Sequence, residues 1–159
     1  MKIKIIWASL LSIAICLAVG FIGSIATMPN LPSWYAALNK PAFTPPNWLF
    51  GPAWTTLYVL MGMAAALVWN KGWEKRAVKA AIYIFALQLA LNFAWSFIFF
   101  GQHWILAALI EIIILWLAII WCIIAFGRVS RLAGWLLAPY ILWVSFASVL
   151  NLSIWLLNR

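Results

Sequence analysis

Acidic side chains are nearly absent from this chain. Among 159 residues there are two, Glu74 and Glu111, and charged residues of both signs make up 8%. A soluble domain of this length has roughly a quarter of its residues charged. Apolar residues make up 69% of the chain, and its mean hydropathy is +1.10. The composition therefore excludes a water-soluble globular protein and predicts a chain that lies mostly in a lipid bilayer.

Residues that bind metals or carry redox chemistry are also scarce. The two cysteines, Cys16 and Cys122, lie in separate apolar runs, and there is a single histidine, His103. A CxxC redox site and a thiolate zinc site are therefore excluded, and one histidine cannot build a metal cluster. The sequence also lacks a nucleophile–base pair and a glycine-rich cofactor loop. We expect no cofactor, no metal and no catalytic residue of the usual kinds.

Long apolar runs are what the chain has in plenty. A bilayer core requires about 20 apolar residues per helix, and five segments reach this length: residues 5–26, 48–69, 79–100, 104–126 and 133–157. The first is longer than the core of a secretion signal and is interpreted as a retained span. We predict an all-α membrane protein, a bundle of five transmembrane helices in one domain over residues 1–159. The polar, proline-bearing loop 27–46 is longer than a simple connection, and we expect it to act as a lid.

Basic residues are distributed unequally between the two ends of the predicted bundle. The end that holds the N-terminus carries eight, and the other end carries Lys40 and Arg159; the eight are Lys2, Lys4, Lys71, Lys75, Arg76, Lys79, Arg128 and Arg131. This excess predicts a cytoplasmic N-terminus and an external C-terminus. The net charge of +8 is spread over short juxtamembrane segments, which favours contact with lipid headgroups and argues against a nucleic-acid partner.

The third span carries two stripes on opposite faces. Ala86, Ala90 and Ala94 recur every four residues, while Gln88 and Asn92 lie two residues away, which is about 200° around a helix. Small residues allow close helix approach in lipid, and rare polar groups mark packed faces. We therefore expect the alanines to face a second protomer and the amides to face the interior of their own bundle. The alternative is that the alanines pack against another helix of the same chain.

Aromatic side chains follow one face of the second span and one face of the fifth. The second carries Trp54 and Tyr58, and the fifth carries Tyr140, Trp143 and then Ala147 and Asn151. If these faces meet the amide face of the third span, they enclose a space with aromatic walls and a few polar groups. That is the general form of a small-molecule pocket, and flat walls suit flat aromatic ligands.

Glu111 lies about seven residues into the fourth span. A carboxylate inside a membrane is costly and is a functional candidate by default. It is consistent with proton-coupled transport, and equally with a neutral side chain hydrogen-bonded to a neighbouring helix. No basic partner for Glu111 is visible inside any predicted span, so we favour the structural interpretation.

Three motifs resemble the tryptophan-rich sensory protein family, also called translocator protein or peripheral-type benzodiazepine receptor. The longest runs Trp34-Tyr35-x-x-Leu38-x-Lys40-Pro41-x-x-x-Pro45-Pro46-x-Trp48-x-Phe50-x-Pro52-x-Trp54-Thr55-x-Leu57-Tyr58. The others are Gln88-x-x-x-Asn92-x-x-Trp95 with Phe99-Phe100-Gly101, and Pro139-Tyr140-x-x-Trp143 with Phe146-Ala147 and Leu150-Asn151. Together they cover nearly the whole chain, and five helices is that family's architecture.

The resemblance implies a ligand site and a set of partners. The family binds porphyrins and benzodiazepine-type ligands, and its members are often homodimers. Carried over by motif, the ligand site consists of Trp34, Trp48, Trp54, Tyr58, Asn92, Trp95, Tyr140, Trp143 and Ala147. Glu111 resembles an acidic residue that the family commonly has early in its fourth helix.

One departure from the family pattern concerns cholesterol. The cholesterol pattern of animal members needs a tyrosine shortly before a basic residue at the end of the fifth helix. Here that region reads Val149-Leu150-Asn151-Leu152-Ser153-Ile154-Trp155, without a tyrosine. This argues against a dedicated cholesterol function and suits a member from a bacterial cell membrane.

Three functions remain open from the sequence. The first is a receptor or sensor that binds a tetrapyrrole in the bundle. The second is a transporter of such ligands, for which Glu111 is the one supporting residue. The third is light- and oxygen-dependent porphyrin breakdown, in which Trp54 and Trp143 are the nearest oxidisable groups.

Overall fold

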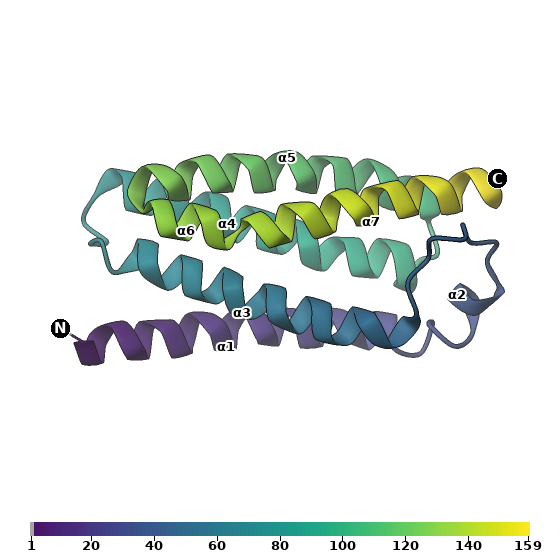
Figure 1. Cartoon of the computed structure of the whole chain (residues 1–159), viewed down its shortest axis with the longest axis horizontal. Helices are drawn as coiled ribbons and strands as arrows, with labels where there is room; N and C mark the ends of the chain where they lie inside the picture. The colour runs from purple at the N-terminus through teal and green to yellow at the C-terminus, as the bar shows by residue number, and fades with distance from the viewer. Residues whose placement is uncertain (1) are drawn as a thin grey trace.

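The computed structural model describes residues 2–159, with side chains described from residue 5 onward, and within this range every regular element is a helix. Five helical segments there are long and apolar enough to cross a membrane: Ile5–Thr27, Asn47–Trp69, Arg76–Gly101, Ile105–Val129 and Arg131–Leu157. They lie side by side as an elongated bundle with the N- and C-termini at opposite ends (Figure 1). The predicted all-α bundle of five transmembrane helices is confirmed, and the ends of these segments differ from the predicted ones by at most three residues.

The first span is the helix α1 (Lys2–Thr27), and the second combines a short 3-10 helix η1 (Asn47–Leu49) with α3 (Phe50–Trp69). The two helices cross closely because of glycine: a Cβ on Gly62 would lie 2.5 Å from the Cα of Ile13. Between them the loop contains one helical turn, α2 (Trp34–Ala37), whose Tyr35 is buried. Burial raises the pKa of Tyr35 to about 12, so the ring enters this apolar region as a neutral group.

The third span begins as α4 (Arg76–Ser96) and ends as a π-helical turn, η2 (Phe97–Gly101). In this turn the backbone hydrogen bond spans five residues, from the Gln102 amide to the Phe97 carbonyl at 2.8 Å. This turn brings both Phe99 and Phe100 into the interior, although they are adjacent in sequence. π-turns commonly occur at functional sites.

The stripes on α4 face in the directions expected from helical geometry. Gln88 and Asn92 are buried, whereas Ala86 and Ala90 are exposed and Ala94 is half-buried. The alanine stripe therefore lies mainly on the outside of this single chain.

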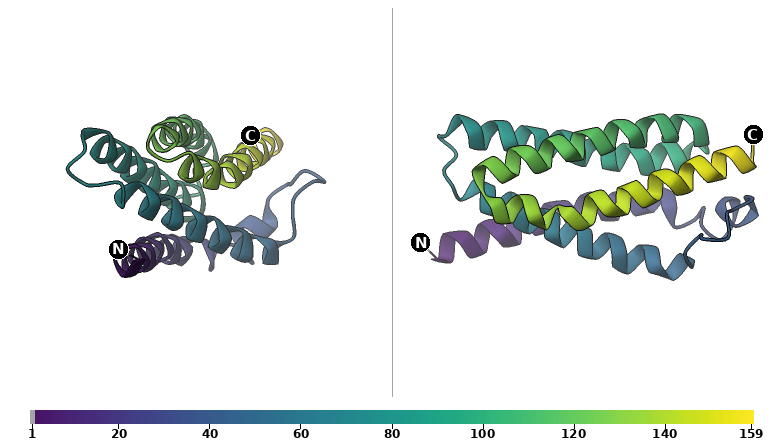
Figure 2. Two further views of the ribbon diagram at one scale, coloured as in Figure 1. Left: turned by 60° about the vertical axis from the view of Figure 1, so that its left-hand side comes forward. Right: turned by 45° about the horizontal axis from the view of Figure 1, so that its top comes forward.

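The fourth span is one helix, α5 (Ile105–Val129), and the fifth is divided into α6 (Arg131–Leu136) and α7 (Ala138–Leu157). The division has a covalent cause, because Pro139 has no N–H to donate to the carbonyl of Trp135. The chain instead closes a tighter turn in which the Leu137 amide donates to the Gly134 carbonyl at 3.2 Å, and Pro139 occupies the first turn of α7. α7 consequently starts with a new direction and leans across the bundle (Figure 2).

Candidate functional site

A cavity of about 750 Å³ lies in the half of the bundle next to the loop, between α1, α3, α4 and α7, with α5 contributing to its lining. Its lining is largely apolar and aromatic, with a few amide and hydroxyl groups. Ligand cavities in proteins are commonly 300–1,000 Å³ and have this composition. Six of the sequence-predicted site residues line it within the bundle: Trp54, Tyr58, Asn92, Trp95, Trp143 and Ala147.

The polar floor of the cavity is a chain of hydrogen bonds that joins three helices. The hydroxyl of Tyr58 on α3 donates to Asn92 Oδ1 at 2.5 Å, and Asn92 Nδ2 on α4 donates to the hydroxyl of Tyr140 on α7 at 3.0 Å. Tyr140 is 1% exposed and lies behind Asn92, outside the cavity lining. Linked hydrogen bonds in a low-dielectric interior fix the orientation of each member. The Asn92 carboxamide is thereby held in one position at the cavity floor.

The aromatic walls meet mostly edge to face. The indoles of Trp54 and Trp143 have ring centroids 6.5 Å apart at 85°, and Phe50 closes on Trp143 at 6.1 Å and 77°. On the α4 side Trp95 stacks on Phe99 at 5.0 Å. Edge-to-face and offset-stacked pairs are the favourable aromatic arrangements. The walls are therefore ordered by contacts with each other before a ligand is present.

A second amide on α7 orients the Trp95 indole. Trp95 Nε1 donates to Asn151 Oδ1 at 3.2 Å, and Asn151 Nδ2 donates to the Ile105 carbonyl at 3.0 Å. Asn151 itself lines the cavity and is buried. The indole N–H is thus satisfied within the protein, and the ring presents an apolar surface to the cavity.

The two tryptophans predicted from the loop motif lie at different places. Trp48 is 71% exposed at the rim of the cavity. Trp34 lies outside the lining, where it stacks on His103 with ring centroids 4.2 Å apart and contacts the edge of Phe99 at 5.4 Å. The structure therefore brings Trp48 to the cavity opening and uses Trp34 to attach the loop to the turn between η2 and α5.

Sequence reasoning missed the contribution of α1. Leu17, Gly20, Phe21 and Ser24 line the cavity, and a Cβ on Gly20 would overlap the Tyr58 ring. The signal was the small-residue series Gly20, Gly23 and Ser24 in an otherwise bulky apolar run. The Phe99 and Phe100 side chains that line the α4 end were likewise noted only as a motif.

Two buried polar side chains lie outside the cavity. Gln88 is fully buried and Glu111 is 9% exposed, and the side-chain oxygens of both, with the Gln88 nitrogen, have no hydrogen-bond partner among residues 5–159. The expected hydrogen bond from Glu111 to a neighbouring helix is therefore not formed within that range. Over the same residues, no three His, Cys, Asp or Glu side chains gather where a metal ion would fit.

Comparison with known proteins identifies the family of this chain. A model of the TspO/MBR family matches residues 12–156. The chain is 50% identical over 149 residues to the tryptophan-rich protein TspO of Chlorobaculum tepidum, which spans 93% of this chain and 94% of that protein. It is 41% identical over 124 residues to the translocator protein of Homo sapiens, spanning 77% and 73% of the two chains. The tryptophan-rich sensory protein of Cereibacter sphaeroides is 38% identical over 125 residues, spanning 79% and 77%. This chain is an integral membrane protein that belongs to the TspO/MBR family, as its motifs predicted.

Proposed function

We propose that this protein is a membrane receptor or sensor that binds a flat, mostly apolar ligand of the porphyrin or benzodiazepine type in the cavity between α1, α3, α4 and α7. Relatives named as sensory and translocator proteins support a receptor, sensor or transporter role. The observation that carries the proposal is the meeting of Trp54, Asn92 and Trp143, from three helices, on one cavity. Aromatic walls favour a flat ring system, and the Asn92 floor provides a fixed polar group for its edge.

We propose that loop 27–46 covers this cavity as a lid. Leu31 and Tyr35 of the loop reach the cavity lining, and the loop lies across one end of the bundle (Figure 1). We propose that the five helices and this loop work as one domain, since the cavity is lined by residues of all five spans, with Ile112 and Leu115 from α5, and by Leu31 and Tyr35 of the loop. No cofactor is required for binding of this kind.

A titration with protoporphyrin IX in nanodiscs tests the receptor proposal. The porphyrin absorption band is expected to shift saturably, and Asn92→Ala is expected to weaken binding by about fivefold to a hundredfold, because a polar contact of about 1–3 kcal/mol is lost. Asn70→Ala is the control, since Asn70 Nδ2 donates only to the Ala66 carbonyl at the opposite end of α3. Absence of saturation at micromolar porphyrin would reject the receptor proposal.

Light-dependent breakdown of a bound porphyrin is a second candidate function. It is favoured by one observation, that the readily oxidised indoles of Trp54 and Trp143 both line the cavity and lie 6.5 Å apart. Product formation in light and oxygen, compared with darkness, should depend on both residues. Trp121→Phe is the matched control because this tryptophan is exposed on α5. Equal turnover in Trp54→Phe, Trp143→Phe and Trp121→Phe would reject a role for the cavity tryptophans.

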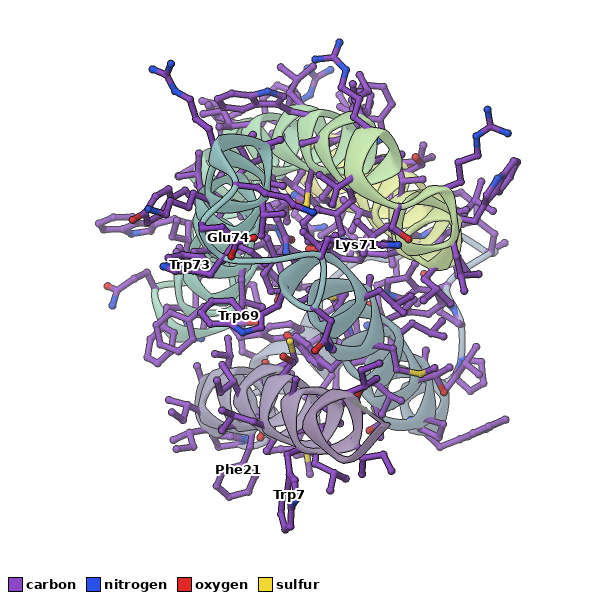
Figure 3. All side chains as sticks on the ribbon, turned by 90° about the vertical axis from the view of Figure 1, so that its left-hand side faces the viewer. Trp7, Phe21, Trp69, Lys71, Trp73 and Glu74 are labelled. Carbon is purple, nitrogen blue, oxygen red and sulfur yellow. The ribbon has the colours of Figure 1, made fainter. Side chains whose placement is uncertain are left out.

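The proposed orientation places the N-terminal end of the bundle in the cytoplasm of a bacterial cell. Figure 3 views this end, where the connection between α3 and α4 carries Lys71 and the rings of Trp69 and Trp73 stack on each other. Lys79 adds a cation 5.9 Å from the Trp73 ring. Tryptophan and lysine at one level are typical of a headgroup interface. Thiol labelling of Lys71→Cys from the cytoplasmic side only is the expected result in oriented membranes.

A further inference from the structure

One side of the cavity is bordered by residues that are also exposed on the outside of the bundle. Phe21, Met28 and Trp48 line the cavity, yet they are 71%, 65% and 71% exposed. Figure 3 shows Phe21 projecting away from the bundle. We define the α1–α3 slot by six lining residues, three on α1 and its end and three on η1 and α3: Phe21, Ser24, Met28, Trp48, Gly51 and Thr55.

The slot lies beyond the positions at which glycine brings α1 and α3 into close contact. Gly62 and Gly20 permit near contact with Ile13 and Tyr58, respectively. Beyond Gly20 the two helices diverge toward the loop, as the right-hand view of Figure 2 shows. On the diverging side the spacing of 48, 51 and 55 on one helix and 21, 24 and 28 on the other places each set along one helical face.

The other lateral boundaries of the cavity are closed. α1 lies against the third span at two positions: a Cβ on Gly23 would lie 3.5 Å from Ser96 Oγ, and one on Gly101 would lie 3.7 Å from the Ala26 Cβ. Between α3 and α7 the indole of Trp143 is wedged against Phe50 at 6.1 Å and Trp54 at 6.5 Å. Passage along either side would require packed side chains to separate.

The loop above the cavity is fastened at two ends. Near its start His103 Nε2 lies 3.0 Å from Asn30 Oδ1, and the His103 ring stacks on Trp34. Near its end the Asn39 amide donates to Asn158 Oδ1 at 3.0 Å, and Asn158 Nδ2 donates to the Asn39 carbonyl at 2.8 Å. Opening the loop would break both attachments.

The loop is also braced from within. Lys40 Nζ donates to the carbonyls of Tyr35, Ala36 and Leu38 at 2.7, 3.0 and 3.0 Å, which neutralises the carbonyl end of α2. These internal hydrogen bonds and the two outer attachments favour a loop that stays closed over the cavity.

The slot itself has the chemistry of a passage for apolar molecules. Ser24 Oγ donates to the Phe21 carbonyl at 2.6 Å, and Thr55 Oγ1 donates to the Gly51 carbonyl at 2.9 Å, so both hydroxyl protons are used within their own helices. The remaining surface is glycine, thioether and aromatic carbon. The slot lies between two membrane-spanning segments, and lipid chains are the solvent on its outer side.

We propose that the cavity exchanges its ligand with the bilayer through the α1–α3 slot while loop 27–46 stays closed. This inference rests on the proposed receptor function. The ligand is accordingly one that dissolves in the membrane before it binds, and its rate of binding follows its concentration in the lipid rather than in water.

Adjacent threonines on α3 provide a matched test in protoporphyrin-loaded nanodiscs. Thr55 and Thr56 are both exposed, and each donates to the carbonyl four residues earlier at 2.9 Å, but only Thr55 lines the cavity, whereas Thr56 lies on the outer α3–α7 groove. Thr55→Phe is expected to slow both association and dissociation about tenfold, an added barrier of about 1.4 kcal/mol in each direction. Thr56→Phe is expected to leave both rates unchanged.

A second pair of variants checks that slower ligand exchange does not come from a folding defect. A Cβ added at Gly51 or at Gly127 meets nothing within 4 Å among the described residues, and of the two only Gly51 borders the slot. Gly51→Leu should slow exchange as Thr55→Phe does, and Gly127→Leu on α5 should not. Unchanged exchange in both slot variants, or slower exchange in Thr56→Phe alone, would overturn the slot. Loss of saturable binding by the unaltered protein would instead reject the receptor proposal, so the two failures are distinguishable.

Discussion

At the scale of single residues, the site depends on one carboxamide that two phenols hold in place. Asn92 accepts from Tyr58 with its oxygen and donates to Tyr140 with its nitrogen. With both bonds made, the carboxamide joins α3 to α7 across α4 and its orientation is fixed from two sides. Tyr140 was predicted as a ligand contact. Because it lies behind Asn92 and outside the cavity lining, we propose that it positions the residue that faces the cavity.

Tyr140→Phe separates these roles. It removes the acceptor of Asn92 Nδ2 and leaves a buried donor unpaired, which is expected to destabilise the protein by roughly 1–3 kcal/mol. The melting temperature should fall, while porphyrin affinity should fall only a few-fold, less than in Asn92→Ala. Tyr83→Phe is the control, because Tyr83 is 65% exposed on α4. If Tyr140→Phe abolished binding without lowering the melting temperature, Tyr140 would contact the ligand directly.

The residue scale also shows what the sequence could predict. Helical spacing alone placed Trp54, Asn92, Trp143 and Ala147 on inward faces, because side-chain direction follows residue number in a regular helix. Helical spacing could not tell that Asn92 lines the cavity and Tyr140 does not, since both residues lie on inward faces. That difference depends on the crossing of α4 and α7, which no local pattern encodes.

At the scale of elements, the regular helices were predictable from the sequence, whereas the irregular turns were not predicted. The five spans follow from the length that a bilayer requires, so composition determines them. The π-turn η2 does not follow from composition, since Phe97–Gly101 is as apolar as the helix before it. The break at Leu137 was readable in principle, because Pro139 cannot donate to the preceding turn, but a proline is also tolerated inside a transmembrane helix.

The attachment of loop 27–46 to the η2–α5 turn gives a prediction at this scale. His103 has a positive φ of 59°, a conformation that asparagine adopts more readily than most residues. His103→Asn therefore preserves the turn but removes the ring that stacks on Trp34. Amide hydrogen exchange of residues 30–38 is expected to accelerate about tenfold, with the spans unaffected, since the loop loses one of its two outer attachments. The comparison is Gln102→Asn, on the neighbouring exposed position. Equal exchange in both variants would mean that Trp34 is held by Phe99 alone.

At the scale of the whole molecule, the bundle has a tight half and an open half. Near the N-terminal end, glycine contacts bring α1 onto α3, and Phe85 of α4 stacks on Phe126 of α5 at 5.5 Å. Near the loop the helices separate and enclose the cavity. The contribution of α1 to the cavity was missing from the sequence prediction because its run from Ile5 is apolar on every side, and a uniformly apolar helix gives no inward face.

Association of two copies is the remaining question at this scale, and we propose that it uses the outer face of α4. Ala86 and Ala90 are exposed and Ala94 is half-buried, on the side of the helix opposite the buried Gln88 and Asn92. In lipid, apolar area gives little drive for association, so close backbone approach along a small-residue ridge is the available source of attraction. The cavity lies on the opposite face of α4, so the proposed contact would leave the ligand site of each copy intact.

Ala90→Phe is expected to abolish the dimer, because a phenyl ring at the centre of the ridge separates the two backbones beyond the range of dispersion contacts. Energy transfer between labelled copies in nanodiscs measures the dimer fraction, and porphyrin affinity should remain within about twofold of the parent protein, since Asn92 and Trp95 face away from the ridge. Ala107→Phe on α5 adds the same ring to another exposed alanine and should leave the dimer unchanged. A dimer that survives Ala90→Phe but is lost in Ala107→Phe would move the interface to α5 and leave the alanine stripe of α4 as an ordinary lipid-facing surface.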